Sequence, residues 1–173
     1  TTSWKRGIIS FVKKLILVSG PAGIGKSTNP KNYASSHPEE KVIVIAADEI
    51  RKAMCGGYDK FPENNNMMLV YDEMIRVAKE AAESHKDVTI LFDTTMLYDE
   101  RRLYFRRQLQ GFDEYELFLL KLHDYNQCLI RNKKRPVEKW VPEDVIKNMV
   151  RRYADPSPYC KLQFDHVEEI YVD

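Results

Sequence analysis

Short apolar runs alternate along the chain with longer segments of mixed polarity. The runs have the length and composition of buried strands, and they cover residues 14–19, 41–47, 87–93, 115–122 and 166–173. Because helix-like segments separate them, the order predicts an α/β fold with parallel strands and helices on both faces of one sheet. Ligands of such folds bind beyond the carboxyl ends of the strands. We therefore expect the glycine-rich loop after the first run, Asp48 after the second and Asp93 at the end of the third to share one cleft.

Three helices are predicted from their spacing and boundary residues. Residues 67–84 carry apolar side chains at helical spacing: Leu69, Met74, Val77, Ala78 and Ala81. Residues 100–112 form a second helix with Gly111 as its C-terminal stop, and Pro142 opens a third helix. Pro30 follows the glycine-rich loop and removes a backbone donor, so we expect a kinked or broken helix there.

The loop itself, SGPAGIGKSTNP at residues 19–30, contains the pattern G-x-x-x-x-G-K-[ST]. Its backbone N–H groups can wrap a pyrophosphate, because glycine permits the dihedral angles that this requires, and the next helix directs its positive dipole end at the anion. Lys26 then reaches the β- and γ-phosphates, and the Ser27 hydroxyl binds Mg²⁺. The expected nucleotide-binding residues of the loop are Gly20, Ala22, Gly23, Ile24, Gly25, Lys26, Ser27 and Thr28.

Length and composition limit the class of protein. The 173 residues suffice for one domain with a substantial core, and we expect a single domain over residues 1–173. The 27 Lys and Arg nearly balance the 26 Asp and Glu, so no overall positive field indicates nucleic acid. Cys55, Cys128 and Cys160 match no metal or redox spacing, and we expect reduced thiols in a cytoplasmic protein. No secretory signal or membrane-spanning run is evident, and the sequence leaves the oligomeric state open.

The remaining motifs favour a kinase over a GTPase switch or an ATP-driven motor. A GTPase carries a D-x-x-G turn and an N-K-x-D base reader, but Arg135 occupies the place of that aspartate here. A motor carries a second carboxylate directly after its magnesium-strand aspartate, whereas Thr94 follows Asp93. A kinase needs a carboxylate for the acceptor proton and cations over the transferring phosphate. Asp48, with Arg51 one helical turn later, and the basic run LIRNKKRPVEKW at 129–140 meet these needs.

These segments resemble the P-loop kinases grouped around the 5′-hydroxyl kinase domain of phage polynucleotide kinase. The similarity extends from Lys14 to the end of the chain, on the segments GPAGIGKST, DEIR, DTTMLYDERR, IRNKKR and VPEDVIKNM. The broader group contains seryl-tRNA kinases and, more distantly, zeta-toxin-like and other small-molecule kinases. The resemblance implies a three-layer P-loop NTPase fold, a five-stranded sheet in the order 2-3-1-4-5 and a short basic lid near residues 129–141.

The resemblance also implies catalytic and nucleotide-binding roles. Asp48 would act as the base toward the acceptor hydroxyl, although aspartate at this position also suits a helix N-cap. Lys26 and Arg135 would stabilise the transferring phosphoryl group, and Arg131 would cover the nucleotide. Asp93 would hold the metal through water.

On the acceptor side, the resemblance implies that Arg51 contacts a phosphate or polar group of the acceptor. The chain itself leaves two further alternatives open. Thr94 contacts the substrate or, together with Thr95, caps the helix that follows. Arg101 and Arg102 bind an acceptor strand or form a solvated helix face.

Three hypotheses follow from the sequence. The leading one is a kinase that uses ATP and Mg²⁺ to phosphorylate a hydroxyl, with the 5′-OH of a nucleic acid as one acceptor. The second is the same chemistry on a small metabolite or nucleotide sugar. The third is a nucleotide-dependent binding module without an acceptor, which would not need Asp48.

Overall fold

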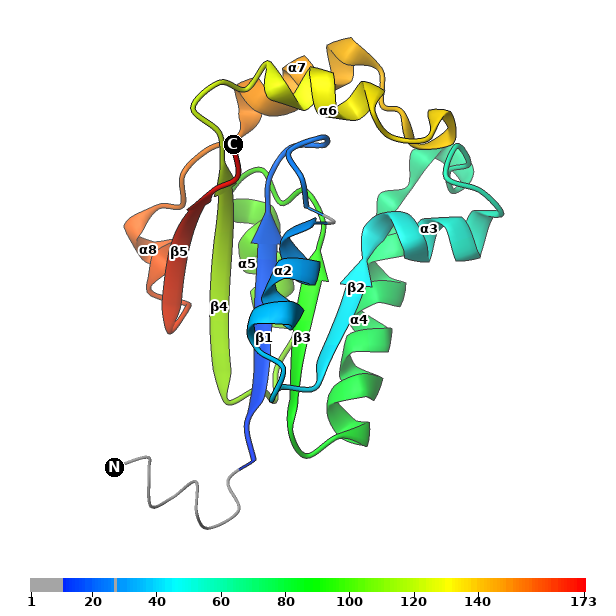
Figure 1. Ribbon diagram of the computed structural model, residues 1–173. Helices are drawn as coiled ribbons and strands as arrows, with labels where there is room; N and C mark the ends of the chain where they lie inside the picture. Colours follow the sequence, from blue (N-terminus) through cyan, green and yellow to red (C-terminus); the bar gives the residue numbers. More distant parts are fainter. Residues whose placement is uncertain (1–10, 27) are drawn as a thin grey trace.

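The computed structural model describes residues 11–26 and 28–173, which form a five-stranded sheet with helices around it (Figure 1). The strands are β1 (Lys13–Ser19), β2 (Val42–Ala46), β3 (Val88–Asp93), β4 (Glu114–Lys121) and β5 (His166–Tyr171). Neighbouring strands are all parallel, in the order β2-β3-β1-β4-β5. The predicted α/β class, the five strands and their order are therefore confirmed.

The helices differ in length and in their place in the fold. They are α2 (Thr28–Ser36), α3 (Ala47–Cys55), α4 (Met67–Ser84), α5 (Asp99–Gln108), α6 (Gln127–Lys133), α7 (Glu143–Arg152) and α8 (Pro158–Lys161). Two short 3₁₀ turns, η1 (Glu63–Asn65) and η2 (Val137–Lys139), complete the set. Within the described residues, no helix combines the length and the apolar character that crossing a bilayer requires.

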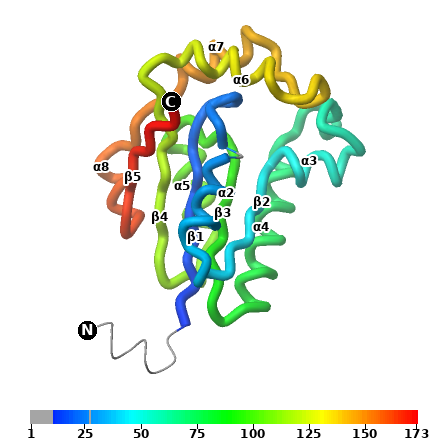
Figure 2. The backbone as a smooth tube through the Cα atoms, in the orientation of Figure 1, coloured from blue at the N-terminus to red at the C-terminus, as the bar shows by residue number. Residues whose placement is uncertain are grey.

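Both faces of the sheet are covered, as the apolar runs predict. Side chains alternate along a strand, so Leu15 and Leu17 of β1 pack with α4 and α5, whereas Ile16 and Val18 pack with α6 and α7. Figure 2 shows α2 in front of the sheet and α5 behind it. All six residues of β3 are buried, as expected for a central strand of a doubly covered sheet.

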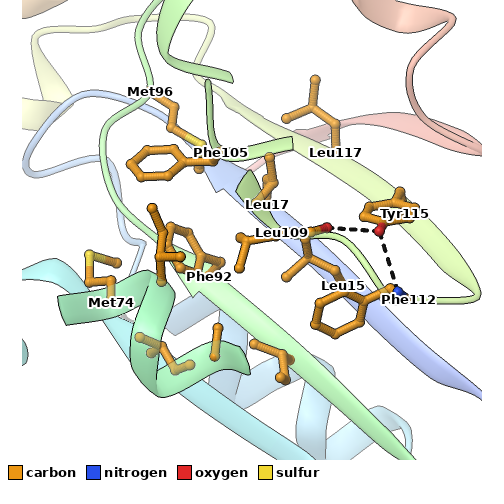
Figure 3. Close-up of a cluster of buried hydrophobic side chains, with 14 of the residues drawn as sticks. Leu15, Leu17, Met74, Phe92, Met96, Phe105, Leu109, Phe112, Tyr115 and Leu117 are labelled. Atoms are coloured by element: carbon orange, nitrogen blue, oxygen red, sulfur yellow. Dashed lines mark hydrogen bonds between the residues drawn. The ribbon is translucent and has the colours of Figure 1, made fainter. Parts of the chain in front are cut away.

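The larger core cluster contains a polar group, the Tyr115 hydroxyl, that is fully hydrogen-bonded. Phe92 and Phe105 lie with their ring centroids 4.9 Å apart in this cluster (Figure 3). Tyr115 reaches into the same cluster, where its hydroxyl donates to the Leu109 carbonyl at 2.7 Å and accepts from the Phe112 N–H at 3.3 Å. The hydroxyl therefore fixes the turn between α5 and β4 without leaving a buried polar group unpaired.

Helix α4 has the predicted bounds, but the prediction of which residues form its apolar face is partly wrong. Its buried residues are Val70, Met74, Ile75, Ala78 and Ala82. Leu69, which we expected on this face, is 47% exposed. The sequence allows either choice because Leu69 and Val70 are both apolar and only packing against the sheet distinguishes them. Gly111 is likewise not the end of α5, which stops at Gln108, although it adopts a left-handed φ of 92° in the following turn.

The kink expected at Pro30 is wrong. Helix α2 begins at Thr28 and runs without interruption to Ser36, so Pro30 lies in its first turn and is buried. The first-turn N–H groups of a helix have no intrahelical acceptor, and proline is therefore tolerated there. The prediction failed because it placed the helix start near Lys26.

Arg102 of α5 is a structural residue, and neither alternative from the sequence is correct for it. Its side chain is fully buried, and its Nη2 donates to the carbonyls of Leu97 at 3.2 Å and Ala154 at 2.6 Å. The same nitrogen reaches the Ser19 hydroxyl at 3.4 Å. The guanidinium therefore ties the end of β1 to the loops that follow β3 and α7.

We expect Arg102→Leu to lower the free energy of unfolding by roughly 2–4 kcal/mol, because it leaves buried carbonyls without a donor. Arg107→Leu, on the exposed end of the same helix, should change it by less than about 0.5 kcal/mol. Urea unfolding of the two variants measures the difference. Equal losses would contradict the structural role of Arg102.

Candidate active site

The glycine-rich loop lies between β1 and α2 and is held by backbone contacts. The Gly20 N–H donates to the Thr95 carbonyl at 2.9 Å, which anchors the start of the loop to the segment after β3. Gly23 and Gly25 adopt φ angles of 81° and 105°, in the region that favours glycine. A Cβ on Gly23 would overlap the carbonyl oxygen of Cys128, so only glycine permits α6 to approach the loop this closely.

Two cavities lie at the carboxyl end of the sheet, on either side of Lys26. The larger one, about 680 Å³, is lined by the loop, the start of α2, Arg131, Arg135 and residues 170–173. The smaller one, about 250 Å³, is lined by the ends of β2 and β3 together with α3, α4 and α7. Lys26 lines both cavities and therefore lies at the junction between them.

Two charged groups of opposite sign lie at this junction: Asp93 is buried and Lys26 is half-buried. Burial lowers the pKa of Lys26, while the nearby carboxylates of Asp93 and Asp48 oppose that change. Asp93 is 8% exposed, and burial raises its pKa, while Lys26 opposes the rise. Within the described part of the chain, neither group forms an ion pair shorter than 4 Å. Both residues line the smaller cavity, and Lys26 also lines the larger one.

Asp48 lies on the first turn of α3, with its side chain 55% exposed at the smaller cavity. One carboxylate oxygen is 3.4 Å from Nη2 of Arg51, and the other is 3.5 Å from Nη2 of Arg135. The N-cap alternative for Asp48 is wrong, because Ala46 occupies the cap position and Asp48 is already inside the helix. The carboxylate therefore lies between two arginines and is more than half exposed at the smaller cavity.

The lid segment, residues 129–141, arches over the carboxyl end of the sheet toward α3 (Figure 1). Arg131 donates to the carbonyls of Ile24 at 2.9 Å and Val172 at 2.6 Å, so it ties the lid to the loop and to the end of β5. On the far side, Lys139 lies 3.9 Å from the Glu49 carboxylate. The lid segment is thereby held at both of its ends, with Arg135 between them.

Arg51, expected to contact the acceptor, is buried and already heavily bonded. Its Nη1 donates to the carbonyls of Tyr58 and Lys60, each at 2.6 Å. Its guanidinium also lies 4.2 Å from the centre of the Phe61 ring. The observed role of Arg51 is thus to fold the segment after α3 against the smaller cavity, and direct contact with an acceptor remains a prediction.

Two residues that follow β3, Thr94 and Arg101, differ in their position relative to the smaller cavity. Thr94 is 5% exposed and lines the smaller cavity, as expected of a substrate contact. The capping alternative for Thr94 and Thr95 is wrong, because Tyr98 is the N-cap of α5. Arg101 lies 4.9 Å from the centre of the Tyr71 ring, and no contact of its own with the cavity is observed in the described residues.

The residues available for Mg²⁺ agree with the chemistry of that ion. Mg²⁺ is bound through one or two carboxylates, its own waters and phosphate oxygens rather than by a protein cage. Asp93 offers such a carboxylate at the junction of the cavities, and Ser27, the other expected ligand, lies outside the described residues. Among the described residues, no cluster of three or more His, Cys, Asp or Glu forms a cage for a metal.

Several residues that line the two cavities were not predicted from the sequence. Asn29 and Asn32 line the larger cavity, and their spacing of three on the helix after the loop was an available signal. Phe61, Met67 and Met149 line the smaller cavity but belong to separate segments. Nothing in their local sequence distinguishes them from ordinary apolar residues.

We expect Asp93→Asn to stabilise the fold at neutral pH. A folded-state pKa above the unfolded value means that ionising Asp93 costs folding free energy once the pH exceeds the unfolded pKa. The stability linked to Asp93 is thus complete in acid and is lost as the pH rises through the folded pKa. The advantage of Asp93→Asn should therefore appear at pH 7 and disappear as the pH falls below about 4.

Urea unfolding at both pH values measures this effect. Asp59→Asn, at an exposed turn, is the matched control and should change stability by less than about 0.5 kcal/mol at either pH. A loss of stability in Asp93→Asn at pH 7 would show that the carboxylate supports the fold instead.

Comparison with solved structures identifies the fold. Kti12 of Chaetomium thermophilum, solved in complex with ADP-AlF3, has a TM-score of 0.64 at 15% identity, over 92% of this chain and 89% of that one. A gluconokinase from Sinorhizobium meliloti has a TM-score of 0.55 at 16% identity, over 94% and 85% of the two chains. A fungal RNA kinase has a TM-score of 0.57 at 17% identity, over 93% of this chain but only 38% of that one. At these identities the similarity shows a P-loop NTPase fold and no specific activity.

The sequence comparisons give the family. No curated protein sequence matches the chain. The AAA domain family matches it over residues 15–156, from the first strand past the lid. This match does not separate the polynucleotide 5′-hydroxyl kinase group from other P-loop members, and that finer assignment stays a prediction. Because the match covers well over half of the sequence, the chain belongs to the AAA domain family.

Proposed function

We propose that this protein is a kinase that transfers the γ-phosphoryl group of ATP, with Mg²⁺, to a hydroxyl group. One observation carries the proposal: a nucleotide-sized cavity and a smaller cavity meet at Lys26. A protein that only binds or hydrolyses a nucleotide has no need of the second cavity. The structural similarity to a gluconokinase and an RNA kinase agrees with transfer chemistry on this fold, and the ADP-AlF3 bound to Kti12 agrees with nucleotide binding.

The donor side of the reaction is assigned to the loop and the lid. The loop residues Gly20 to Thr28, including Ala22, would hold the phosphates through their backbone N–H groups. Lys26 and Arg135 carry positive charge at the junction, where negative charge develops on the transferring group. Arg131 keeps the loop and the lid in register through its two carbonyl contacts. Ser27 and Asp93 would hold Mg²⁺, which supplies further charge neutralisation.

The acceptor side is assigned to Asp48. Its exposed carboxylate faces the smaller cavity, and its neighbour Arg135 lines the larger one. A hydroxyl in the smaller cavity could pass its proton to Asp48 while its oxygen attacks the phosphorus, and effective attack requires such positioning. The buried Thr94 stands where a hydrolase would carry a water-activating carboxylate, which favours transfer over hydrolysis.

Asp48→Asn tests the base. Asparagine keeps the size of aspartate but cannot accept a proton, so the transfer rate should fall roughly 10²–10⁴-fold while ATP affinity changes little. The assay measures transfer from labelled ATP to oligonucleotides, tRNA and a metabolite panel, with calorimetry for ATP. Asp59→Asn is the control and should match the wild type. An unchanged transfer rate in Asp48→Asn would refute the catalytic role.

Arg135→Ala tests the lid. Because Arg135 lies at the junction and acts on charge that develops during transfer, turnover should fall by roughly 10³–10⁵, far more than ATP affinity. Lys134→Ala removes an exposed cation from the preceding position of the same turn and serves as the control. If Arg135→Ala weakened ATP binding without slowing turnover, Arg135 would be a ground-state contact only.

A further inference from the structure

We propose that the acceptor is a compact, uncharged alcohol with an apolar or aromatic body, rather than the 5′ end of a nucleic acid. This inference rests on the proposed function, because it concerns the acceptor of the same transfer. It follows from the walls of the smaller cavity and from the state of the arginines around it.

The walls of the smaller cavity are mostly apolar. Phe61, Met67, Tyr71 and Met149 form one part of the lining, together with Ala22, Ala46 and Ala47. The volume of about 250 Å³ is below the range of roughly 300–1,000 Å³ usual for drug-sized ligands. Such walls favour a small molecule that buries an apolar surface, since burial contributes in proportion to apolar area.

The charged residues of the lining are concentrated where the chemistry would take place. They are Lys26, Asp48, Arg51 and Asp93. Lys26 also lines the larger cavity, Asp93 is assigned to Mg²⁺, and Asp48 is needed for the acceptor proton. Only Arg51 could then bind a negatively charged acceptor group.

Arg51 is poorly placed for that role. Its guanidinium is occupied by the carbonyls of Tyr58 and Lys60 and lies close to Asp48. Taking it away from those carbonyls would leave two main-chain acceptors unpaired and loosen the segment that carries Phe61. The arginine therefore shapes the wall of the cavity instead of recognising an anion.

The two arginines that could have lined a nucleic-acid channel are committed elsewhere as well. Arg102 is fully buried among the Leu97 and Ala154 carbonyls. Arg101 lies over the ring of Tyr71 and near the sulfur of Met68. Proteins that hold single strands combine stacking side chains with a groove of free cations along the backbone. Aromatic rings line the smaller cavity, but these two arginines are already engaged by carbonyls, a ring and a sulfur atom.

The transfer step balances for any alcohol of this class. The acceptor oxygen forms a bond to the γ-phosphorus as the bond from that phosphorus to the β–γ bridging oxygen breaks. The acceptor proton passes to the carboxylate of Asp48, and ADP leaves with the electron pair of the broken bond. No oxidant, reductant or further reactant is needed.

The first experiment compares acceptors by two independent measurements. The neutral probes are uridine and 2-phenylethanol, and the charged probes are gluconate and a 5′-hydroxyl oligonucleotide. Labelled-ATP transfer gives kcat/KM, and NMR of the methionine methyl groups in the ADP–Mg²⁺-saturated protein reports occupancy of the cavity. Met67 and Met149 line the cavity, whereas Met96 is buried in the core and serves as the internal control.

We expect a neutral probe to shift the Met67 and Met149 signals but not that of Met96, and to give a kcat/KM at least about tenfold above those of the charged probes. Preference for gluconate or the oligonucleotide by either measurement overturns the inference, as does the absence of any shift with the neutral probes. If a neutral probe shifts both signals but no phosphate is transferred to any probe, the inference about the cavity stands and the proposed kinase function fails.

A pair of phenylalanine variants tests the wall directly. Phe61 and Phe11 are 55% and 52% exposed, and each lies near a cation, at 4.2 Å from Arg51 and 5.6 Å from Lys86. Only Phe61 lines the cavity. Phe61→Ala should raise KM for the preferred neutral acceptor about 10- to 100-fold with kcat and ATP affinity little changed, whereas Phe11→Ala should leave all three unchanged.

A second variant shows whether a raised KM in Phe61→Ala comes from the lost cavity contact or from a local folding defect. Met149→Ala removes a cavity contact from α7, so it should also raise KM without involving the Arg51 contacts. Wild-type KM values in both Phe61→Ala and Met149→Ala would overturn the proposed wall.

Discussion

The close approach of α6 to the glycine-rich loop is the constraint on which the rest of the site depends. Gly23 has no side chain to separate its backbone from the Cys128 carbonyl, so the two main chains come into direct contact. Arg131, one turn after Cys128, can then reach the Ile24 and Val172 carbonyls and join the loop, the lid and β5. The lid continues from this point, and it carries Arg135 over the junction of the two cavities. A larger residue at position 23 would displace α6, the nucleotide cavity and Arg135 together.

The same arrangement explains why buried charge is retained against stability. The parallel strands end at one edge, so the buried Asp93 of β3 and the loop after β1 lie together there. Burial then disfavours the charged forms of both Lys26 and Asp93, and their mutual attraction offsets only part of that cost. Perturbed pKa values of this kind concentrate at functional sites. A fold selected for stability alone would gain from neutral groups at both positions.

Most of the fold could be predicted because the sequence patterns that indicate its helices and strands are local and extend over many consecutive residues. The β3 run is mostly apolar, which indicates a doubly covered strand, and α4 spans 18 residues of helical spacing. The failures have physical reasons. Helix α6 is only seven residues long and has no side-chain cap, so its sequence carries no boundary signal. The kink at Pro30 depended on where α2 starts, which the loop geometry decides and the proline does not. Whether Leu69 or Val70 is buried depends on the sheet behind them.

The sequence predicts one part of the site much better than the other, for a related reason. The proposed donor side comes mainly from one continuous loop, whose glycines, Lys26 and Ser27 must keep a fixed spacing around a phosphate, so the pattern indicates its chemistry directly. The proposed acceptor side is assembled from α3, the segment after it, α4, the end of β3 and α7. No spacing rule connects those elements. Arg51 and Arg102 could not be interpreted correctly for the same reason, since they donate to carbonyls that only the folded chain brings near. Acceptor specificity in such a protein is therefore a property of packing, and it can differ between chains that share the loop, the sheet and the lid.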